Sequence, residues 1–280
     1  MFKWICLSVL VATISFVNGA NLDLISSRIV GGEVAKTGEF PWQVSLRNNG
    51  RHFCGGGLVS LQHVLTAAHC MVGKDTSLLT VITGSNSLAS GGETHGVRNI
   101  SIHRNYVGGS VTSYRYDVSV LTLAAEITES SVQYPIGLPI ENTESGVQAR
   151  ASGWGRTIHP GSSLPTALQK LNVTILNNTD CQSYHNLTIY YDQICAMKQY
   201  GSGMCNGDSG SPLVSDGRVI GIVSWGVTCA LGYPDVYTRV YAYLYWIGSI
   251  IYNTETPPSL KIDRHVPGNF NIDSKNLLLR

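Results

Sequence analysis

Apolar and polar residues alternate in several short segments of this chain, a pattern typical of antiparallel β-strands with one buried face. The segments are 43–46, 57–60, 78–82, 97–102, 117–123, 147–152, 169–176 and 219–225. Residues 241–252 differ, because their aromatic and aliphatic side chains recur at helical spacing. The pattern predicts an all-β protein that ends in a helix.

The N-terminal residues follow a different pattern. Lys3 precedes the apolar run 5–17, which is shorter than the roughly 20 residues needed to span a bilayer as a helix. These features predict a signal peptide over 1–19, followed by a pro-segment over 20–28. No later segment is long and apolar enough to cross a membrane. We therefore expect a secreted, extracellular protein.

Composition limits the classes of protein further. The chain has 280 residues, 43% of them hydrophobic, which is enough for one large core or two small barrels. The net charge of +1 gives no reason to expect nucleic acid or an anionic membrane as a partner. Residues 254–280 contain prolines and scattered charges with little periodicity, and we predict that they form a disordered extension.

Six of the seven cysteines lie beyond the predicted signal peptide. An even set in a secreted chain predicts three disulfides, for which fifteen pairings exist. A metal cluster is the alternative, and the lack of Cys-x-x-Cys or Cys/His knuckle spacing argues against it. The six residues are Cys54, Cys70, Cys181, Cys195, Cys205 and Cys229.

The segment 207–212, Gly-Asp-Ser-Gly-Ser-Pro, suits a sharp turn that exposes a nucleophile. The N–H groups of Gly207 and Ser209 could point at one spot and hold an oxyanion. Because a serine hydroxyl alone is a weak nucleophile, Ser209 needs a histidine base. His69, after the apolar strand 64–68, is the candidate base, and Asp117 is the candidate acid that orients it.

Together these segments resemble the chymotrypsin-like serine endopeptidases, in which His, Asp and Ser follow one another in this order. The resemblance runs from Ile29 to about Asn253. Further motifs that carry it are Ile29-Val30-Gly31-Gly32, Pro41-Trp42, Cys54-Gly55-Gly56, Gly153-Trp154-Gly155, Ser224-Trp225-Gly226 and Val236-Tyr237-Thr238-Arg239-Val240.

The resemblance implies two six-stranded antiparallel β-barrels and a C-terminal helix. The first barrel would cover 29–130, and the second barrel with the closing helix would cover 131–253. The His69, Asp117 and Ser209 side chains would meet in the cleft between the barrels, with no metal or organic cofactor. The implied disulfides are Cys54–Cys70, Cys181–Cys195 and Cys205–Cys229.

The resemblance also implies activation by cleavage. An activating protease would cut between Arg28 and Ile29, and the freed α-amino group would pair with Asp208. A buried carboxylate without a partner is costly, so this pairing would organise the neighbouring oxyanion turn. The chain would therefore be made as a zymogen.

The residues of the implied specificity pocket depart from the trypsin pattern. Gly203 stands where trypsins carry aspartate, whereas Asp235 stands where trypsins and chymotrypsins carry glycine. The pair resembles brachyurin-type crustacean collagenases, which accept cationic and bulky apolar residues. Met204 is larger than usual and narrows the pocket, and Gly226 keeps its entrance open. Ser224 and Trp225 complete the predicted wall.

The expected partners are protein or peptide substrates, the activating protease and protein inhibitors, with the chain itself a monomer. A second hypothesis is a catalytically silent homologue that acts as a binding or regulatory protein. Ser211, at a position that is usually glycine, and the long C-terminal extension favour that alternative, whereas the intact His69, Asp117 and Ser209 favour an enzyme. Candidate N-glycosylation sites are Asn99, Asn172, Asn177 and Asn186.

Overall fold

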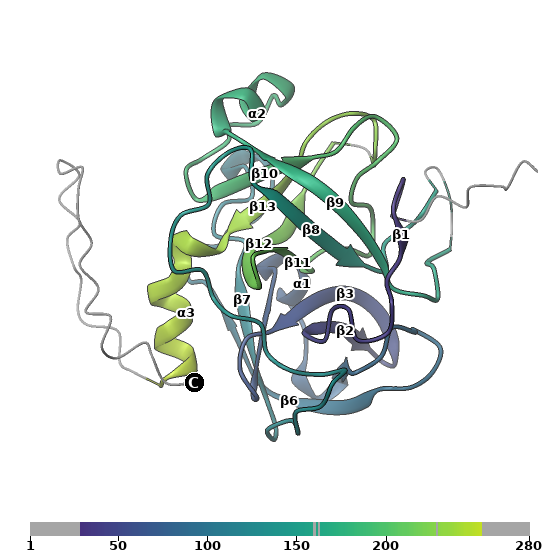
Figure 1. The fold of residues 1–280 in the computed structure, drawn as a ribbon. Helices are drawn as coiled ribbons and strands as arrows, with labels where there is room; N and C mark the ends of the chain where they lie inside the picture. The colour runs from purple at the N-terminus through teal and green to yellow at the C-terminus, as the bar shows by residue number, and fades with distance from the viewer. Residues whose placement is uncertain (1–28, 159–160, 162, 228, 254–280) are drawn as a thin grey trace, which may run out of the picture.

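The structure is a computed structural model that describes residues 29–158, 161, 163–227 and 229–253. The predicted signal peptide, the pro-segment with Arg28 and the C-terminal extension lie outside these residues. Two β-barrels make up the described part of the chain, and in Figure 1 the second barrel is drawn above the first. The predicted fold class is thereby confirmed, whereas the domain boundaries remain a prediction.

The first barrel closes in the order β2-β3-β4-β7-β6-β5, with antiparallel pairing between all neighbours. Closure leaves no unpaired sheet edge and turns alternate side chains inward. Its strands are β2 (Gln43–Asn48), β3 (Arg51–Leu58), β4 (His63–Thr66), β5 (Leu79–Thr83), β6 (Glu93–Ile102) and β7 (Ser119–Leu123).

The second barrel closes in the order β8-β9-β10-β13-β12-β11, because β9 also pairs with β8. The short strand β1 (Glu33–Val34) adds to the start of β9, so the beginning of the described chain lies on this second barrel. Its strands are β8 (Gln148–Gly153), β9 (Gln169–Leu176), β10 (Gln193–Met197), β11 (Pro212–Ser215), β12 (Arg218–Trp225) and β13 (Asp235–Arg239).

Helices are few and short. They are α1 (Ala68–Met71), α2 (Asn178–Tyr184) and α3 (Leu244–Ile251), with 3₁₀ turns η1 (Thr76–Leu78), η2 (Ser110–Thr112) and η3 (Val240–Tyr243). The predicted closing helix therefore begins as η3 and continues as α3. None of the helices within the described ranges is long and apolar enough to cross a membrane.

Asn177 caps the start of α2. Its side chain accepts a hydrogen bond from the Asp180 N–H at 2.8 Å, which makes Asn177 the N-cap. Asp180 lies in the first turn, where its negative charge favours the positive end of the helix dipole.

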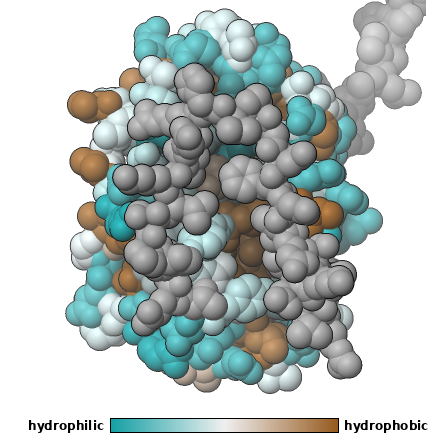
Figure 2. Space-filling model, turned by 90° about the vertical axis from the view of Figure 1, so that its left-hand side faces the viewer, coloured by the Kyte–Doolittle hydropathy of each residue, from teal (hydrophilic) through white to brown (hydrophobic). Residues whose placement is uncertain are grey.

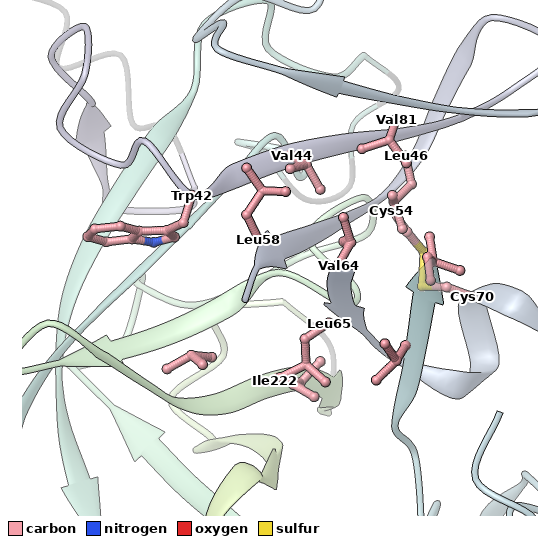
Figure 3. Packing of buried hydrophobic residues seen from close by; sticks show 14 of the residues in the cluster. Trp42, Val44, Leu46, Cys54, Leu58, Val64, Leu65, Cys70, Val81 and Ile222 are labelled. Carbon is pink, nitrogen blue, oxygen red and sulfur yellow. A yellow bond between two sulfur atoms is a disulfide. The ribbon is translucent and has the colours of Figure 1, made fainter. Parts of the chain in front are cut away.

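The core of the first barrel extends across the junction with the second barrel. Figure 3 shows Val44, Leu58 and Leu65 among its buried side chains, with Ile222 of β12 beside Leu65. The closing helix packs against the same cluster through Ile247. On the face that carries α3, hydrophilic and hydrophobic residues are interspersed (Figure 2). The two barrels therefore share apolar contacts at the place where the candidate site lies.

The three disulfides join the pairs that the resemblance implied. Cys54 is bonded to Cys70, as Figure 3 shows for the first barrel. The other two bonds, Cys181–Cys195 and Cys205–Cys229, lie in the second barrel and its loops. The first bond ties the short helix α1, which carries His69, to β3.

Candidate active site

His69 and Asp117 meet at the ends of two paired strands of the first barrel. His69 follows β4 on α1, Asp117 lies two residues before β7, and Thr66 of β4 pairs with Ser119 of β7. His69 Nδ1 lies 2.7 Å from Asp117 Oδ2, and the His69 backbone N–H donates to Asp117 Oδ1 at 2.8 Å. The carboxylate thereby fixes the imidazole ring and leaves Nε2 to exchange a proton.

Asp117 is fully buried, and two residues of the second barrel hold it. Ser224 Oγ donates to Asp117 Oδ2 at 2.6 Å, and Thr238 Oγ1 donates to the Asp117 carbonyl oxygen at 2.7 Å. Burial of His69 opposes its positive charge, but the hydrogen bond and the charge of Asp117 prevail and raise the pKa of His69. Asp117 therefore strengthens the candidate base, and residues of the second barrel hold Asp117 in place.

Ser209 lies where two tight turns follow one another. The Asp208 N–H donates to the Cys205 carbonyl at 2.9 Å, and the Ser211 N–H donates to the Asp208 carbonyl at 3.0 Å. Ser209 remains partly exposed in this turn, although its neighbour Asp208 is buried. The local sequence thus presents the hydroxyl-bearing residue at the surface of the cleft.

Contacts with the first barrel fix the position of the Ser209 turn. The Gly55 N–H donates to the Ser209 carbonyl at 2.8 Å. Gly210 has a φ of 79°, and a Cβ at this position would collide with Thr66 and the Gly55 carbonyl. Only glycine fits this close approach with such a backbone angle.

His69 and Ser209 line the same cavity, whose volume is about 430 Å³. In the described part of the chain no hydrogen bond joins His69 Nε2 to Ser209 Oγ. Such bonds are often long without substrate and tighten when it binds. The structure therefore places the predicted nucleophile and base in the same cleft, where no hydrogen bond joins the two described side chains.

The backbone N–H groups of Gly207 and Ser209 donate to no protein acceptor among the residues described. Both are therefore available to an oxygen atom in the cleft. Gly207 has a φ of 105°, and its carbonyl oxygen lies 3.0 Å from His52 Nε2. His52 Nδ1 in turn lies 2.9 Å from Ser45 Oγ. His52, which the sequence analysis did not single out, thus supports the turn.

Ser211 replaces the usual glycine of the motif without leaving its hydroxyl unpaired. The side chain is fully buried, and Gln43 Nε2 donates to Ser211 Oγ at 3.3 Å. Ser152 Oγ donates to Gln43 Oε1 at 2.7 Å. Because a buried polar group is costly only when it lacks a partner, this chain of three side chains accommodates the serine.

Asp208 and Ile29, the two residues of the predicted activation contact, are both buried. The Gly155 and Cys205 N–H groups donate to the Asp208 carboxylate at 2.6 and 3.0 Å. Burial nevertheless raises the pKa of Asp208 to about 6. Ile29 packs in the core cluster of the second barrel, and no hydrogen bond or ion pair in the described residues joins it to Asp208. Among the residues that the structure describes, Asp208 is therefore a buried acid without a cationic partner.

Most of the predicted pocket residues line the cavity. Gly203 lies behind the others, where a Cβ would be 3.2 Å from Asp235 Oδ2. Met204 is only 5% exposed, and most of its side chain packs in the core, so it narrows the pocket less than its size suggests. The pocket residues that line the cavity beside His69 and Ser209 are Met204, Ser224, Trp225, Gly226 and Asp235.

Asp235 is half-buried at one side of this cavity. Its Oδ2 accepts a hydrogen bond from the Met204 N–H at 2.8 Å. Burial raises the pKa of Asp235 to about 7; the Met204 N–H opposes the rise, and the charge of Asp208 adds to it. The hydroxyl of Tyr237 is buried without a protein partner in the described chain, and burial and the same two carboxyl groups raise its pKa. With a pKa of about 7, the Asp235 carboxyl group can change its charge near neutral pH.

Tyr114 lines the cleft, and the sequence analysis did not predict it as a site residue. Its ring centroid lies 6.1 Å from that of Trp225, so the two aromatic side chains flank the cavity. Tyr114 belongs to a loop with no strand or helix periodicity, and no local signal separates it from the other tyrosines. Only its place three residues before Asp117 could have drawn attention to it.

One group of potential metal ligands occurs within the described ranges, and it lies at this site. The atoms of Cys54, His69 and Cys70 lie within 4.8 Å of one another. The two sulfurs are joined in a disulfide, so neither is available as the thiolate that binds zinc. These residues are therefore a poor fit for a metal ion.

The four asparagines of the glycosylation motifs are all exposed. Asn99 lies on β6, Asn172 lies on β9, and Asn186 lies in the loop after α2. The side-chain amide of Asn99 donates to Ser101 Oγ at 3.0 Å, and that of Asn177 donates to Asp180 Oδ2 at 2.7 Å. An N-linked glycan would occupy one of the two N–H positions of such an amide.

Comparison with known proteins identifies the family of this chain. The trypsin family matches residues 29–247. The chain is 40% identical to chymotrypsin-2 of Vespa crabro over 221 residues, which cover 78% of this chain and 98% of that protein. It is 38% identical to trypsin delta of Drosophila melanogaster, over 81% of this chain and 89% of that protein. It is also 38% identical to trypsin II-P29 of Gallus gallus, over 89% and 98%. This chain belongs to the trypsin family of serine proteases.

Proposed function

We propose that this protein is a secreted serine endopeptidase that is made as a zymogen. The observation that carries the proposal is the 2.7 Å contact between His69 and Asp117 beside a cavity that Ser209 also lines. Trypsin-family membership and three disulfides support the reaction class and an oxidising, extracellular location.

In the proposed reaction Ser209 Oγ attacks the carbonyl carbon of the substrate, and His69 Nε2 takes the hydroxyl proton. Asp117 stabilises the imidazolium, while the Gly207 and Ser209 N–H groups hold the oxyanion. The C–N bond then breaks, and His69 gives its proton to the leaving amine. Water hydrolyses the acyl-enzyme by the same steps, which restores the Ser209 hydroxyl. No metal or organic cofactor takes part.

The remaining parts of the proposal concern processing and partners. A signal peptide over 1–19 is removed, and an activating protease cuts the pro-segment after Arg28. The mature enzyme is a monomer that acts on proteins or peptides and is controlled by protein inhibitors. The exposure of Asn99, Asn172, Asn177 and Asn186 supports their use as glycosylation sites.

The test is whether the cleaved protein creates new peptide ends. Purified chain that begins at Ile29 is mixed with a pool of unfolded proteins, and the products are sequenced by mass spectrometry. An endopeptidase gives new internal termini. A catalytically silent homologue leaves the pool unchanged, and that result would support the binding or regulatory alternative.

We further propose that Asp235 gives the pocket mixed specificity. A carboxylate beside apolar walls needs hydration, a hydrogen bond or a cationic partner. A substrate Lys or Arg supplies the cation. A substrate Phe, Tyr or Leu side chain packs against the apolar walls instead, while Asp235 keeps its hydrogen bond from the Met204 N–H. The enzyme should therefore cleave after apolar and aromatic residues, and also after Arg and Lys.

Asp235→Gly and Asp235→Asn should selectively weaken cleavage after Arg and Lys. The expected loss is that of one partly desolvated charge pair, about 2–5 kcal/mol. Cleavage after Phe or Leu should be unchanged or improved, because those residues use the apolar walls. Fluorogenic peptides that differ only in the residue before the scissile bond measure both effects. Equal losses on all peptides would mean that Asp235 only supports the fold of the pocket.

The preference should also depend on pH, because the pKa of Asp235 is raised to about 7. Below that value the carboxyl is neutral and does not attract a cation, so the Arg-to-Phe ratio of kcat/KM should rise with pH. Between pH 6 and 8 the ionised fraction rises about tenfold, and the ratio should follow it. The titration of His69 changes kcat/KM for both substrates by the same factor, so it cancels in the ratio. Asp208 and Tyr237 are the other titratable groups that face Asp235. A ratio that stays flat in the wild type contradicts the prediction, and Asp235→Asn is the matched control with a flat ratio.

A further inference from the structure

The loop before Asp117 has an unusual backbone. Ser113, Tyr114 and Tyr116 have φ values of 49°, 53° and 61°, all in the left-handed region. Residues other than glycine are uncommon there, and they persist only where surrounding contacts hold them. The loop carries Tyr114 of the cleft wall and ends at the carboxylate that contacts His69.

The second barrel supplies the contacts that hold this loop. Gln193 Nε2 donates to the Ser113 carbonyl at 2.7 Å, in a buried position. The Arg115 guanidinium forms a two-pronged ion pair with Asp192, with N–O distances of 3.0 to 3.2 Å. Gln193 is the first residue of β10, and Asp192 directly precedes it. One end of a second-barrel strand therefore holds a loop of the first barrel at two points.

The Asp192 end of the Arg115–Asp192 ion pair is shielded from water, whereas the Arg115 side chain is 20% exposed. Asp192 is 2% exposed and accepts a further hydrogen bond from the Tyr243 hydroxyl at 2.8 Å. The guanidinium lies 4.2 Å from the ring centre of Tyr190 and 4.8 Å from that of Tyr116. Loss of the Asp192 carboxylate removes the two-pronged contact that fixes the Arg115 guanidinium, so Arg115 and the loop around it should move.

We propose that Asp192 is a positioning residue for catalysis. Through its ion pair with Arg115, Asp192 fixes the positions of Tyr114 and Asp117 relative to the second barrel, which carries Ser209. Tyr114 directly precedes Arg115, and Asp117 follows it by two residues. Asp192 thereby determines both the position of Tyr114 in the cleft and the contact between Asp117 and His69. This inference rests on the proposed endopeptidase function and adds a residue that touches neither the substrate nor His69.

Asp192→Asn tests the inference because it keeps the side-chain size and removes the charge that faces Arg115. Displacement of a catalytic group by about 1 Å can cost about a hundredfold in rate. We expect kcat/KM per titrated active site to fall about tenfold to a hundredfold on a tetrapeptide substrate. The loss should be smaller on an ester of a single amino acid, which does not reach the Tyr114 wall.

A pH profile separates positioning from a merely structural role. Because Asp117 raises the pKa of His69, a loosened contact lowers that pKa, and the acid limb of kcat/KM should move to lower pH in Asp192→Asn. Repeating the profile in a His103→Gln background removes a histidine whose pKa the charge of Asp192 also affects. The charged and titratable groups that face Asp192 are His103, Arg115, Arg239 and Tyr243.

Two matched variants complete the experiment. Glu39→Gln removes a comparable half-buried ion pair, Lys170–Glu39 at 2.6 Å, whose residues do not line the cavity. It should leave kcat/KM and the acid limb unchanged. Asp192→Glu retains the charge and should restore part of the activity. If Asp192→Asn yields no titratable sites, Arg115→Lys carries the same test, because lysine cannot form the two-pronged contact.

The outcomes distinguish this inference from the proposed function. A wild-type chain that has no turnover after cleavage would overturn the endopeptidase proposal itself. A fully active wild type, with Asp192→Asn equal to it in kcat/KM per site and in acid limb, would overturn only the role of Asp192. Equal losses on the tetrapeptide and the ester without a shift of the acid limb would also contradict it.

Discussion

Ser209→Ala should lower kcat by roughly a million-fold while the protein still folds. The side chain lies partly exposed in a turn that backbone hydrogen bonds hold, so its hydroxyl is not needed for that turn. His69→Ala should cost about as much, because nucleophile and base act as a unit. Peptide hydrolysis by each cleaved, purified variant measures the loss.

Ser183→Ala is the control for this experiment. Ser183 is an exposed serine on α2, outside the cavity, and its replacement should leave kcat unchanged. Circular dichroism and thermal unfolding establish that each variant is folded. Turnover like that of the wild type in Ser209→Ala, free of contaminating protease, would remove the proposed mechanism.

An Arg28→Gln chain should remain an inactive zymogen when it is treated with a trypsin-like activator. The N–H groups that hold the Asp208 carboxylate do not replace a cation, since burial still raises its pKa to about 6. The free ammonium of Ile29 would supply that cation. Ile29 also has a φ of 31°, which a β-branched residue avoids, and loss of the peptide bond to Arg28 removes that restraint.

The pH dependence of the free energy of unfolding should also differ between the uncleaved and the cleaved chain. A rise in the pKa of Asp208 from 3.8 to about 6 corresponds to about 3 kcal/mol. Because the folded pKa is the higher one, this stability is present below pH 3.8 and is lost as the pH rises through 6. In a Ser209→Ala background, which prevents self-digestion, the uncleaved chain should therefore lose more stability between pH 4 and 7 than the cleaved chain.

N-terminal sequencing of active enzyme decides whether cleavage matters. The activation hypothesis predicts Ile29 as the first residue of every active preparation. Full activity in a chain whose Arg28 is still joined to Ile29 would refute it. A lysine variant, Arg28→Lys, serves as control because it should still be cleaved and activated.

Short motifs with a tight local geometry made most of the fold and site predictable from sequence. The segment around Ser209 needs glycine at 210, because the first barrel leaves no room for a Cβ there, and that need is visible as a motif. The three disulfides followed from the same resemblance. Strand β9 has the predicted bounds 169–176, since its alternation is regular and one face is buried.

Contacts between residues far apart in the chain could not be predicted in this way. His52 and Gln43 support the Ser209 turn from more than a hundred residues away, and their own surroundings in sequence are those of ordinary strand residues. Strand β10 begins at Gln193 without a clear alternating pattern, so the hold of Asp192 on Arg115 had no local signal. Such pairs become visible only when the two barrels are placed together.

The central claim is that Ser209 is a nucleophile activated by His69. The most direct measurement is labelling of the cleaved protein with an irreversible, serine-directed phosphonylating reagent, followed by peptide mass spectrometry. We predict one stoichiometric adduct on Ser209, its loss in Ser209→Ala, and a rate of labelling that falls steeply in His69→Ala. An intact, folded and cleaved wild-type chain that takes up no reagent, or takes it up at another serine, would contradict the account.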